Sequence, residues 1–163
     1  MKQYTSKDIL NVAIMGHGGS GKTSLVESML FLSGMLSKMG NTYDGNTICD
    51  FDAEEIKRRS SISSSIAPLE WKNRKINFID TPGSFDFESG VCEGLRAADS
   101  SLIVLSGKDG VLSGTEKVVQ MSDEKKLPKV FFVNGLCDDE SRFYRVFEGL
   151  KASFGPAVCP VVV

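Results

Sequence analysis

The hydrophobic positions along the chain form short apolar runs that alternate with longer amphipathic stretches. The runs have the length and density of buried parallel strands, and the stretches carry apolar residues at helical spacing. The predicted strands cover 9–15, 65–71, 76–80, 101–107 and 129–134, and the predicted helices cover 22 to a stop at 40–41, 87–98, 114–126 and 139–154. This order predicts an α/β fold with a mostly parallel central sheet, helices on both faces, and ligands at the carboxyl ends of the strands.

Residues 40–64 interrupt this alternation because they show no sustained periodicity. They mix Gly, Asp, Asn and Ser with the charged cluster EEIKRRS, and so long a connection inside a compact domain is usually functional or mobile. The two strands that follow are separated only by residues 72–75, which predicts an antiparallel hairpin. The hairpin would deliver Asp80 to the end of a strand.

Composition describes an ordinary globular domain. The chain has 163 residues, 41% of them hydrophobic and 25% charged, which is the size of one domain. Its net charge is −2, so no overall basic field would draw it to DNA, to other nucleic acid or to an acidic membrane surface. We expect neither DNA nor a membrane as partner, and we assume a monomer because no sequence feature argues for an oligomer.

The four cysteines are scattered and form no C-x-x-C pair, which argues against zinc and against a disulfide framework. The N-terminus lacks a signal-peptide pattern, and no window approaches 18 apolar residues. These features predict a cytoplasmic protein with reduced thiols. Residues 156–163, PAVCPVVV, have the pattern of a strand that is just beginning, so we expect the chain to be a fragment of a longer protein.

A phosphate-binding P-loop is the strongest motif. Residues 16–24, GHGGSGKTS, match G-x-x-x-x-G-K-[ST] in full and lie between a predicted strand and a predicted helix, as a P-loop requires. Glycines let successive N–H groups curl around phosphate oxygens beside the positive end of a helix. Lys22 is expected to reach the β- and γ-phosphates, and Thr23 to offer its hydroxyl to Mg²⁺. The predicted phosphate-binding residues are Gly16, His17, Gly18, Gly19, Ser20, Gly21, Lys22, Thr23 and Ser24.

The alternative for this motif is a chance Gly-rich turn, which a chain of this length should contain about once in a hundred sequences. A second motif, DTPG at 80–83, is weaker alone because Asp before Pro-Gly is also an ordinary turn. Downstream of a P-loop it gains a mechanism, since Asp80 can hold the Mg²⁺ shell while the Gly83 N–H meets the γ-phosphate. Together the motifs predict a nucleotide-sensing switch.

Five segments carry a more specific resemblance: GHGGSGKTSLVESMLFLSG, FDAEEIKRRSSISSS, WKNRKINFIDTPGSFDFESGV, LRAADSSLIVLSGKDGV and PKVFFVN. In their order and spacing the chain resembles, over essentially all of residues 1–163, the N-terminal nucleotide-binding domain of the elongation factor G family, including its elongation-factor-G-like paralogues. The resemblance implies the three-layer fold of a translation-factor G domain, GTP and GDP as ligands, Mg²⁺ as cofactor, GTP hydrolysis, and the ribosome as partner of the full-length protein.

The resemblance also implies that residues 1–163 form one GTP-binding domain that lacks the family's last strand and helix and its later domains. It places Ser61 where the family has the Mg²⁺-binding Thr of the first switch loop. The predicted metal ligands are therefore Thr23, Ser61 and Asp80. The alternative for Ser61 is that SSISSS is simply a solvated polar loop.

The sequence departs from the family at the base-reading motif. The family has Asn-Lys-x-Asp where this chain has Asn134-Gly135-Leu136-Cys137. We expect Asn134 to contact the base, whereas Gly135 has no stem to cover it and Cys137 offers no carboxylate. Losing a charge-assisted bidentate pair should remove about 2 to 4 kcal/mol of base discrimination. Asp138 or Asp139 could reach the base through a bulge, and the alternative is a helix N-cap in DDES.

The sequence also departs from the family at two positions near the phosphates. Ser84 stands where the family has the His that positions the attacking water, so hydrolysis is expected to be slow. His17 lies in the P-loop and is not a substitute. The predicted catalytic residues are Lys22 and Ser84. Gly19 stands where translation factors commonly have Asp, which should remove a site for a monovalent cation.

Three functions are compatible with these features. The first is a GTP-hydrolysing switch domain of a translation factor. The second is a degenerate module that binds nucleotide with little or no hydrolysis. The third is a P-loop ATPase with relaxed base specificity. Comparing the binding of GTP, GDP and ATP distinguishes them.

Overall fold

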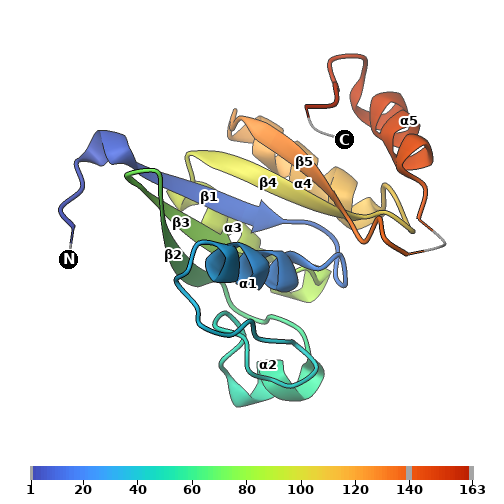
Figure 1. The fold of residues 1–163 in the computed structure, drawn as a ribbon. Coiled ribbons are helices and arrows are strands. Elements are labelled where there is room, and N and C mark those ends of the chain that lie inside the picture. Colours follow the sequence, from blue (N-terminus) through green and yellow to red (C-terminus); the bar gives the residue numbers. More distant parts are fainter. Residues whose placement is uncertain (1, 139–140, 162–163) are drawn as a thin grey trace.

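The computed structural model describes residues 2–138 and 141–161 and is built around a five-stranded sheet (Figure 1). The strands are β1 (Ile9–Met15), β2 (Ser65–Trp71), β3 (Arg74–Asp80), β4 (Ser100–Ser106) and β5 (Lys129–Asn134), arranged in the order β2-β3-β1-β4-β5. β2 pairs antiparallel with β3, and the other neighbours are parallel. The predicted α/β fold with a mostly parallel sheet is confirmed.

Helices cover both faces of the sheet, which gives three layers (Figure 1). α1 (Lys22–Leu32) covers one face, and α3 (Glu88–Ala97), α4 (Ser113–Glu124) and α5 (Phe143–Phe154) cover the other. The short helix α2 (Ala53–Arg58) contributes no residue to either core cluster, and single 3₁₀ turns lie at Ser6–Asp8 and Phe85–Phe87. Neighbouring residues of β1 point to opposite faces, so Ile14 packs in the cluster that includes α1, and Met15 packs in the cluster that includes α3, α4 and α5. Because the carboxyl half of β1 is buried on both faces, its sequence is apolar at every position except Asn11.

The first helix is shorter than predicted. It ends at Leu32 and not at 40–41, because Gly34 adopts a φ of 78° and the Met35 N–H donates to the Leu30 carbonyl at 3.0 Å. The connection from the helix to β2 is correspondingly longer.

The connection also contains a helix that its lack of periodicity did not predict. α2 has only six residues and begins with a capping box, in which Asp52 accepts from the Glu54 N–H at 2.8 Å and Glu55 accepts from the Asp52 N–H at 3.2 Å. One and a half turns are too few to establish a helical period. The helix is recognisable from its cap rather than from its hydrophobic pattern.

The hairpin and the last helix differ from prediction at their boundaries. Lys72 and Asn73 have φ values of 45° and 63° and form a two-residue turn, so β3 begins at Arg74 rather than at 76. The last helix begins at Phe143 with Arg142 as its N-cap, so Asp138 does not cap it. Asp139 lies outside the described residues.

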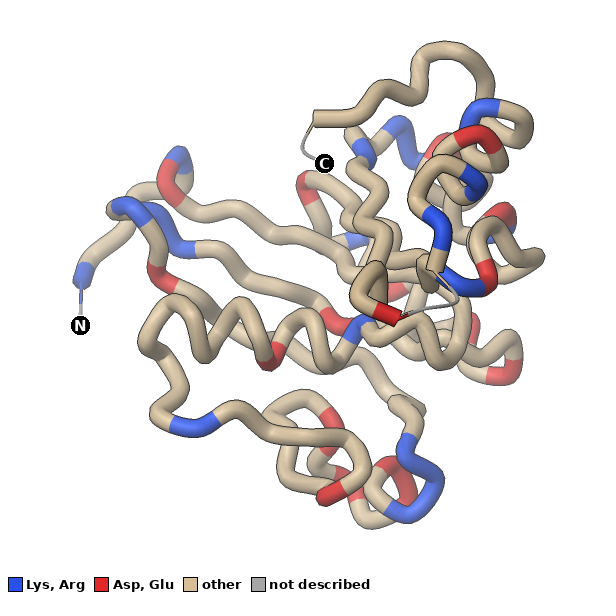
Figure 2. Tube along the Cα trace, turned by 45° about the vertical axis from the view of Figure 1, so that its right-hand side comes forward, with Lys and Arg blue, Asp and Glu red and all other residues tan. Residues whose placement is uncertain are grey.

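The predicted C-terminal strand is not found in its described part. Residues 156–161 form a turn and irregular structure, and 162–163 lie outside the description. Acidic and basic residues are interspersed along the trace (Figure 2). Within the described ranges, no helix has both the length and the apolar character to cross a membrane.

Candidate nucleotide-binding site

The P-loop connects the carboxyl end of β1 to the first residue of α1. Gly16, Gly19 and Gly21 adopt positive φ values of 145°, 80° and 86°, in agreement with the role predicted for glycines in this loop. The Lys22 side chain folds back over the loop, and its ammonium donates to the carbonyls of Gly16 at 3.1 Å and His17 at 3.2 Å. Because an ammonium has three donors, one N–H is left for a ligand.

Lys22 is only 6% exposed, and burial lowers the pKa of its ammonium, opposed by the charges of Asp80 and Asp50. In the same loop the Ser20 hydroxyl is buried and has no hydrogen-bond partner among the described residues. A buried cation beside an unpartnered hydroxyl, at the start of a helix, suits an anionic ligand.

Two hydroxyl groups from distant parts of the chain meet beside Lys22. Thr23 Oγ1 donates to Asp80 Oδ2 at 2.7 Å, and Ser61 Oγ donates to Asp50 Oδ1 at 2.7 Å. The two hydroxyl oxygens lie 3.4 Å apart. Since a hydroxyl has one proton, both protons are held by carboxylates and both oxygens present lone pairs to each other. Neighbouring oxygens around Mg²⁺, at bond lengths of 2.0–2.1 Å, lie about 3 Å apart, so the pair is close to that spacing.

The two carboxylates carry the charge of this cluster. Burial raises the pKa of Asp80 to about 6, opposed by the Thr23 hydrogen bond and by Lys22, and Asp80 Oδ1 is buried without a partner among the described atoms. Burial also raises the pKa of Asp50, opposed by the hydrogen bond from Ser61. In the described part of the chain no three His, Cys, Asp or Glu side chains form a metal site by themselves. The residues therefore fit Mg²⁺ only with hydroxyl and ligand oxygens completing its shell.

The structure brings the predicted metal ligands Ser61 and Thr23 together and joins Thr23 to Asp80, and it adds Asp50, which the sequence did not predict. Asp50 is 4% exposed and lies eleven residues before Ser61 in the segment without periodicity. The available signal was its position inside a connection that also supplied a metal-ligand candidate. Ser61 is 9% exposed, so the alternative of a solvated loop is wrong at this residue.

The DTPG turn packs directly on the P-loop. The Thr81 N–H and hydroxyl both donate to the Ile14 carbonyl, at 3.2 and 2.8 Å, and fix the turn to β1. A Cβ at Gly83 would lie 2.4 Å from Lys22 Nζ and 2.8 Å from Gly18 Cα. The following residue, Ser84, accepts from the Asp86 N–H at 3.4 Å and caps the 3₁₀ turn. Gly83 of this turn therefore lies directly against the Lys22 ammonium.

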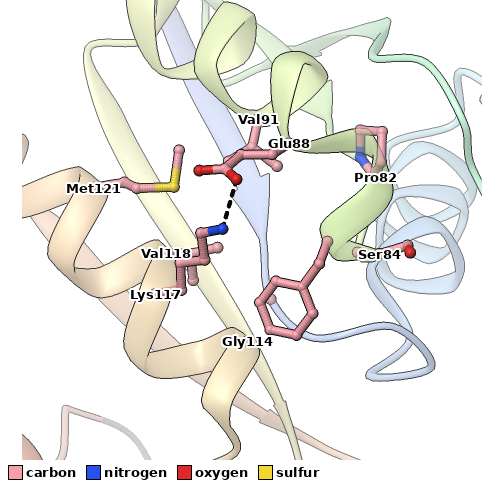
Figure 3. A pocket seen from close by; sticks show the side chains of 11 residues that line it. Pro82, Ser84, Glu88, Val91, Gly114, Lys117, Val118 and Met121 are labelled. Carbon is pink, nitrogen blue, oxygen red and sulfur yellow. Dashed lines mark hydrogen bonds and ion pairs between the residues drawn. The ribbon is translucent and has the colours of Figure 1, made fainter.

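A small pocket between α3 and α4 adjoins this turn (Figure 3). Lys117 of α4 forms an ion pair with Glu88 at 2.5 Å and lies 5.1 Å from the centre of the Phe85 ring. Phe85 meets His17 edge-on, with ring centres 6.3 Å apart. Phe85 therefore packs between His17 of the P-loop and Lys117 of α4, which positions the 3₁₀ turn.

The segment predicted to contact the base reaches the P-loop from the end of β5. Asn134 Nδ2 donates to the Ser20 carbonyl at 3.1 Å, and Asn134 Oδ1 accepts from the Gly135 N–H at 2.9 Å. Asn134 thus ties this segment to the phosphate loop. Cys137 is exposed, and the Asp138 carboxylate lies 3.5 Å from where a Cβ of Gly135 would stand.

A mostly parallel sheet with a P-loop after its first strand and an Asp at the tip of the adjacent strand is the arrangement of a P-loop nucleotide-binding domain. Residues 7–158 match the family model described as the elongation factor Tu GTP binding domain, and the chain belongs to this family.

The relatives support a more specific resemblance to elongation factor G. The chain is 35% identical to elongation factor G of Granulibacter bethesdensis over 99% of this chain and 23% of that protein. It is 36% identical to the elongation factor G-like protein of Thermotoga maritima over 96% of this chain and 22% of that protein. It is 34% identical to the mitochondrial ribosome-releasing factor 2 of Culex quinquefasciatus over 95% of this chain and 21% of that protein.

The fold is also similar to that of a solved structure. A crystal structure of a protein from Thermus thermophilus superposes with a TM-score of 0.88 at 33% identity, over 91% of this chain and 22% of that chain. The predicted resemblance to elongation factor G and the predicted G-domain fold are confirmed. The chain spans less than a quarter of the length of these relatives.

Proposed function

We propose that this chain is the GTP-binding and GTP-hydrolysing switch domain of an elongation-factor-G-like translation factor that acts on the ribosome. The observation that carries the proposal is the meeting of the Thr23 and Ser61 hydroxyl oxygens, 3.4 Å apart, beside Lys22 and Asp80. A P-loop alone accounts for phosphate binding. The arrival of Ser61 from the connection before β2 links that connection to the nucleotide and makes the site a switch.

Each residue has a role in this proposal. The P-loop N–H groups and the free N–H of Lys22 bind the β- and γ-phosphate oxygens. Thr23 and Ser61 would hold Mg²⁺ directly, while Asp80 and Asp50 accept hydrogen bonds from their hydroxyl groups. When bound, Mg²⁺ neutralises charge on the phosphate oxygens. The Gly83 N–H meets the γ-phosphate and so reports whether it is present.

Hydrolysis is proposed to be slow because Ser84 cannot replace the histidine of the family. Its hydroxyl is already used in capping the 3₁₀ turn. Ser84→His should therefore raise ribosome-stimulated GTP turnover by about 10- to 100-fold, within the range of general acid–base contributions. Steady-state phosphate release from the intact protein measures this, with Ser84→Ala as the control that removes only the hydroxyl. An unchanged rate in Ser84→His would show that residue 84 does not limit the reaction.

Base recognition is proposed to rest on Asn134, with weak selection for guanine. Asn134 is tied to the Ser20 carbonyl, and Cys137 supplies no carboxylate for the purine edge. This observation favours relaxed base specificity as a second candidate, which would make the domain a nucleoside triphosphatase that also accepts ATP.

Cys137→Asp should raise the preference for GTP over ATP by about 10- to 100-fold, because it restores a charge-assisted acceptor. Competition binding with labelled GTP measures the ratio. Cys92→Asp, at another exposed cysteine, is the matched control and should leave the ratio unchanged. If Cys137→Asp changes nothing either, the segment after Asn134 does not face the base.

The proposal as a whole is tested by GTP hydrolysis in the intact protein with and without ribosomes. Stimulation by ribosomes supports a translation factor. Nucleotide binding without any hydrolysis above background would instead support the degenerate module. The cytoplasmic location and the monomeric state stay predictions.

A further inference from the structure

The connection between α1 and β2 is attached to the rest of the domain through two buried carboxylates. Glu27 of α1 is 1% exposed and accepts from the Gly40 N–H at 3.0 Å and the Ile48 N–H at 2.5 Å. Glu55 of α2 is 3% exposed and accepts from three backbone N–H groups. In Figure 1 the connection and α2 lie below α1 as one folded unit. Glu27 binds the first part of this unit, at residues 40 and 48, and Glu55 binds the second part, at residues 52, 62 and 63.

Glu55 holds the chain on both sides of Ser61. Its Oε1 accepts from the Ile62 N–H at 2.9 Å and the Ser63 N–H at 3.1 Å, while its own carbonyl accepts from the Ser60 N–H at 3.2 Å. The residues on both sides of Ser61 are therefore hydrogen-bonded to Glu55. Its hydroxyl then reaches Asp50 and Thr23.

Capping α2 does not account for this arrangement. A capping box needs only the Asp52 N–H, which Glu55 Oε2 accepts at 3.2 Å, and it can be made at the surface. Among the described residues no ion pair is found for Glu55, and a buried carboxylate is costly unless it is hydrogen-bonded. The two additional bonds, to Ile62 and Ser63, give this buried charge its partners and place Ser61.

We propose that Glu55 is a positioning residue that sets the Mg²⁺ affinity of the nucleotide site by holding Ser61 against Thr23, while Glu27 tethers the start of the same connection. The inference rests on the proposed function, because Mg²⁺ and nucleotide are the ligands of that site. It adds that the fold of the connection, through the bonds of Glu55 to the Ile62 and Ser63 N–H groups, places the Ser61 hydroxyl.

Glu55→Gln tests the proposal, with Glu54→Gln as the matched control. Glu54 is the preceding residue of the same helix, is 54% exposed at its side chain, and pairs only with Lys57 and Arg58 in the described structure. In the intact protein, release of a fluorescent GTP analogue is measured while Mg²⁺ is titrated. Glu55→Gln should raise the half-saturating Mg²⁺ concentration about tenfold, the effect of roughly one lost hydrogen bond, and Glu54→Gln should leave it unchanged.

Ser61→Ala shows whether Glu55 acts through Ser61. If it does, the double variant with Glu55→Gln needs no more Mg²⁺ than Ser61→Ala alone, because the group being positioned is already gone. Full addition of the two effects, or equal Mg²⁺ dependence of Glu55→Gln and the control, would overturn the proposal. Glu55→Asp keeps the charge and should restore part of the Mg²⁺ affinity. This variant shows that the loss in Glu55→Gln is not caused by a failure to fold.

Limited trypsin digestion without nucleotide separates this inference from the proposed function. Arg58 and Arg59 are exposed, and cleavage there should be faster in Glu55→Gln than in Glu54→Gln. If the wild-type protein binds no nucleotide, the proposed function fails, yet faster cleavage still supports the tether. Equal cleavage rates contradict the tether whatever the nucleotide binding. If Glu55→Gln is cleaved faster but its Mg²⁺ dependence is unchanged, Glu55 stabilises the connection without affecting Mg²⁺ binding, and the proposal is overturned.

Discussion

Replacing Lys22 with methionine is expected to weaken the binding of a nucleoside triphosphate by about 100-fold or more. One ammonium N–H is left free by the bonds to Gly16 and His17, and hydrogen bonds to charged groups contribute about 1.5 to 3 kcal/mol each. Lys22 is also the buried cation beside Asp80 and Asp50, so methionine would leave two buried carboxylates without it. Isothermal titration calorimetry at saturating Mg²⁺ measures the loss.

Lys38→Met is the control for this prediction, because Lys38 is an exposed lysine that follows α1. Its triphosphate affinity should match that of the wild type. An affinity for triphosphate that survives in Lys22→Met would mean that the phosphates do not bind at the P-loop.

The second large effect is expected at Gly83. Gly83→Ala places a methyl group 2.4 Å from Lys22 Nζ and 2.8 Å from the Gly18 backbone, where no atom can be accommodated without movement. The turn must withdraw from the P-loop, which carries the residue 83 N–H away from the γ-phosphate. Overpacking of this kind costs about 1 to 3 kcal/mol, so triphosphate affinity should fall about 10- to 100-fold. Diphosphate affinity should change little.

The ratio of GTP to GDP affinity is the measurement for Gly83→Ala. Gly149→Ala in α5 serves as control, since its methyl group would meet Val111 at an ordinary 3.8 Å. Equal losses of GTP and GDP affinity would place the effect in the P-loop as a whole and contradict a γ-phosphate role for Gly83.

The features that could be predicted from the sequence are those that local patterns encode. The strand before the P-loop, the loop itself and Asp80 at the tip of β3 follow from an apolar run, a glycine spacing and a hairpin. All three lie within short stretches, and the parallel sheet then brings them to one edge. Asn134 could be placed for the same reason, because it ends the last predicted strand.

The features that were missed depend on contacts between distant residues. Thr23 meets Ser61 across 38 positions and Asp80 across 57, and Asp50 joins them from a segment with no period of its own. Family resemblance placed Ser61, whereas nothing in the pattern singled out Asp50, Glu55 or Glu27. The spacing of Asp52 and Glu55 signals only the capping box, whereas the bonds of Glu55 to the Ile62 and Ser63 N–H groups and those of Glu27 have no sequence signature, because their partners are not side chains. The same limitation applies to the 3₁₀ turn at Phe85, whose contacts to His17 and Lys117 appear only in three dimensions.

Titration calorimetry of the intact protein against GTP, GDP and ATP, with and without Mg²⁺, tests the central claim most directly. The structure predicts that triphosphate binds, that Mg²⁺ tightens its binding, and that Thr23→Ala removes most of the Mg²⁺ effect. Absence of nucleotide binding, or triphosphate binding that Mg²⁺ does not change, would contradict a site built from Lys22, Thr23, Ser61 and Asp80.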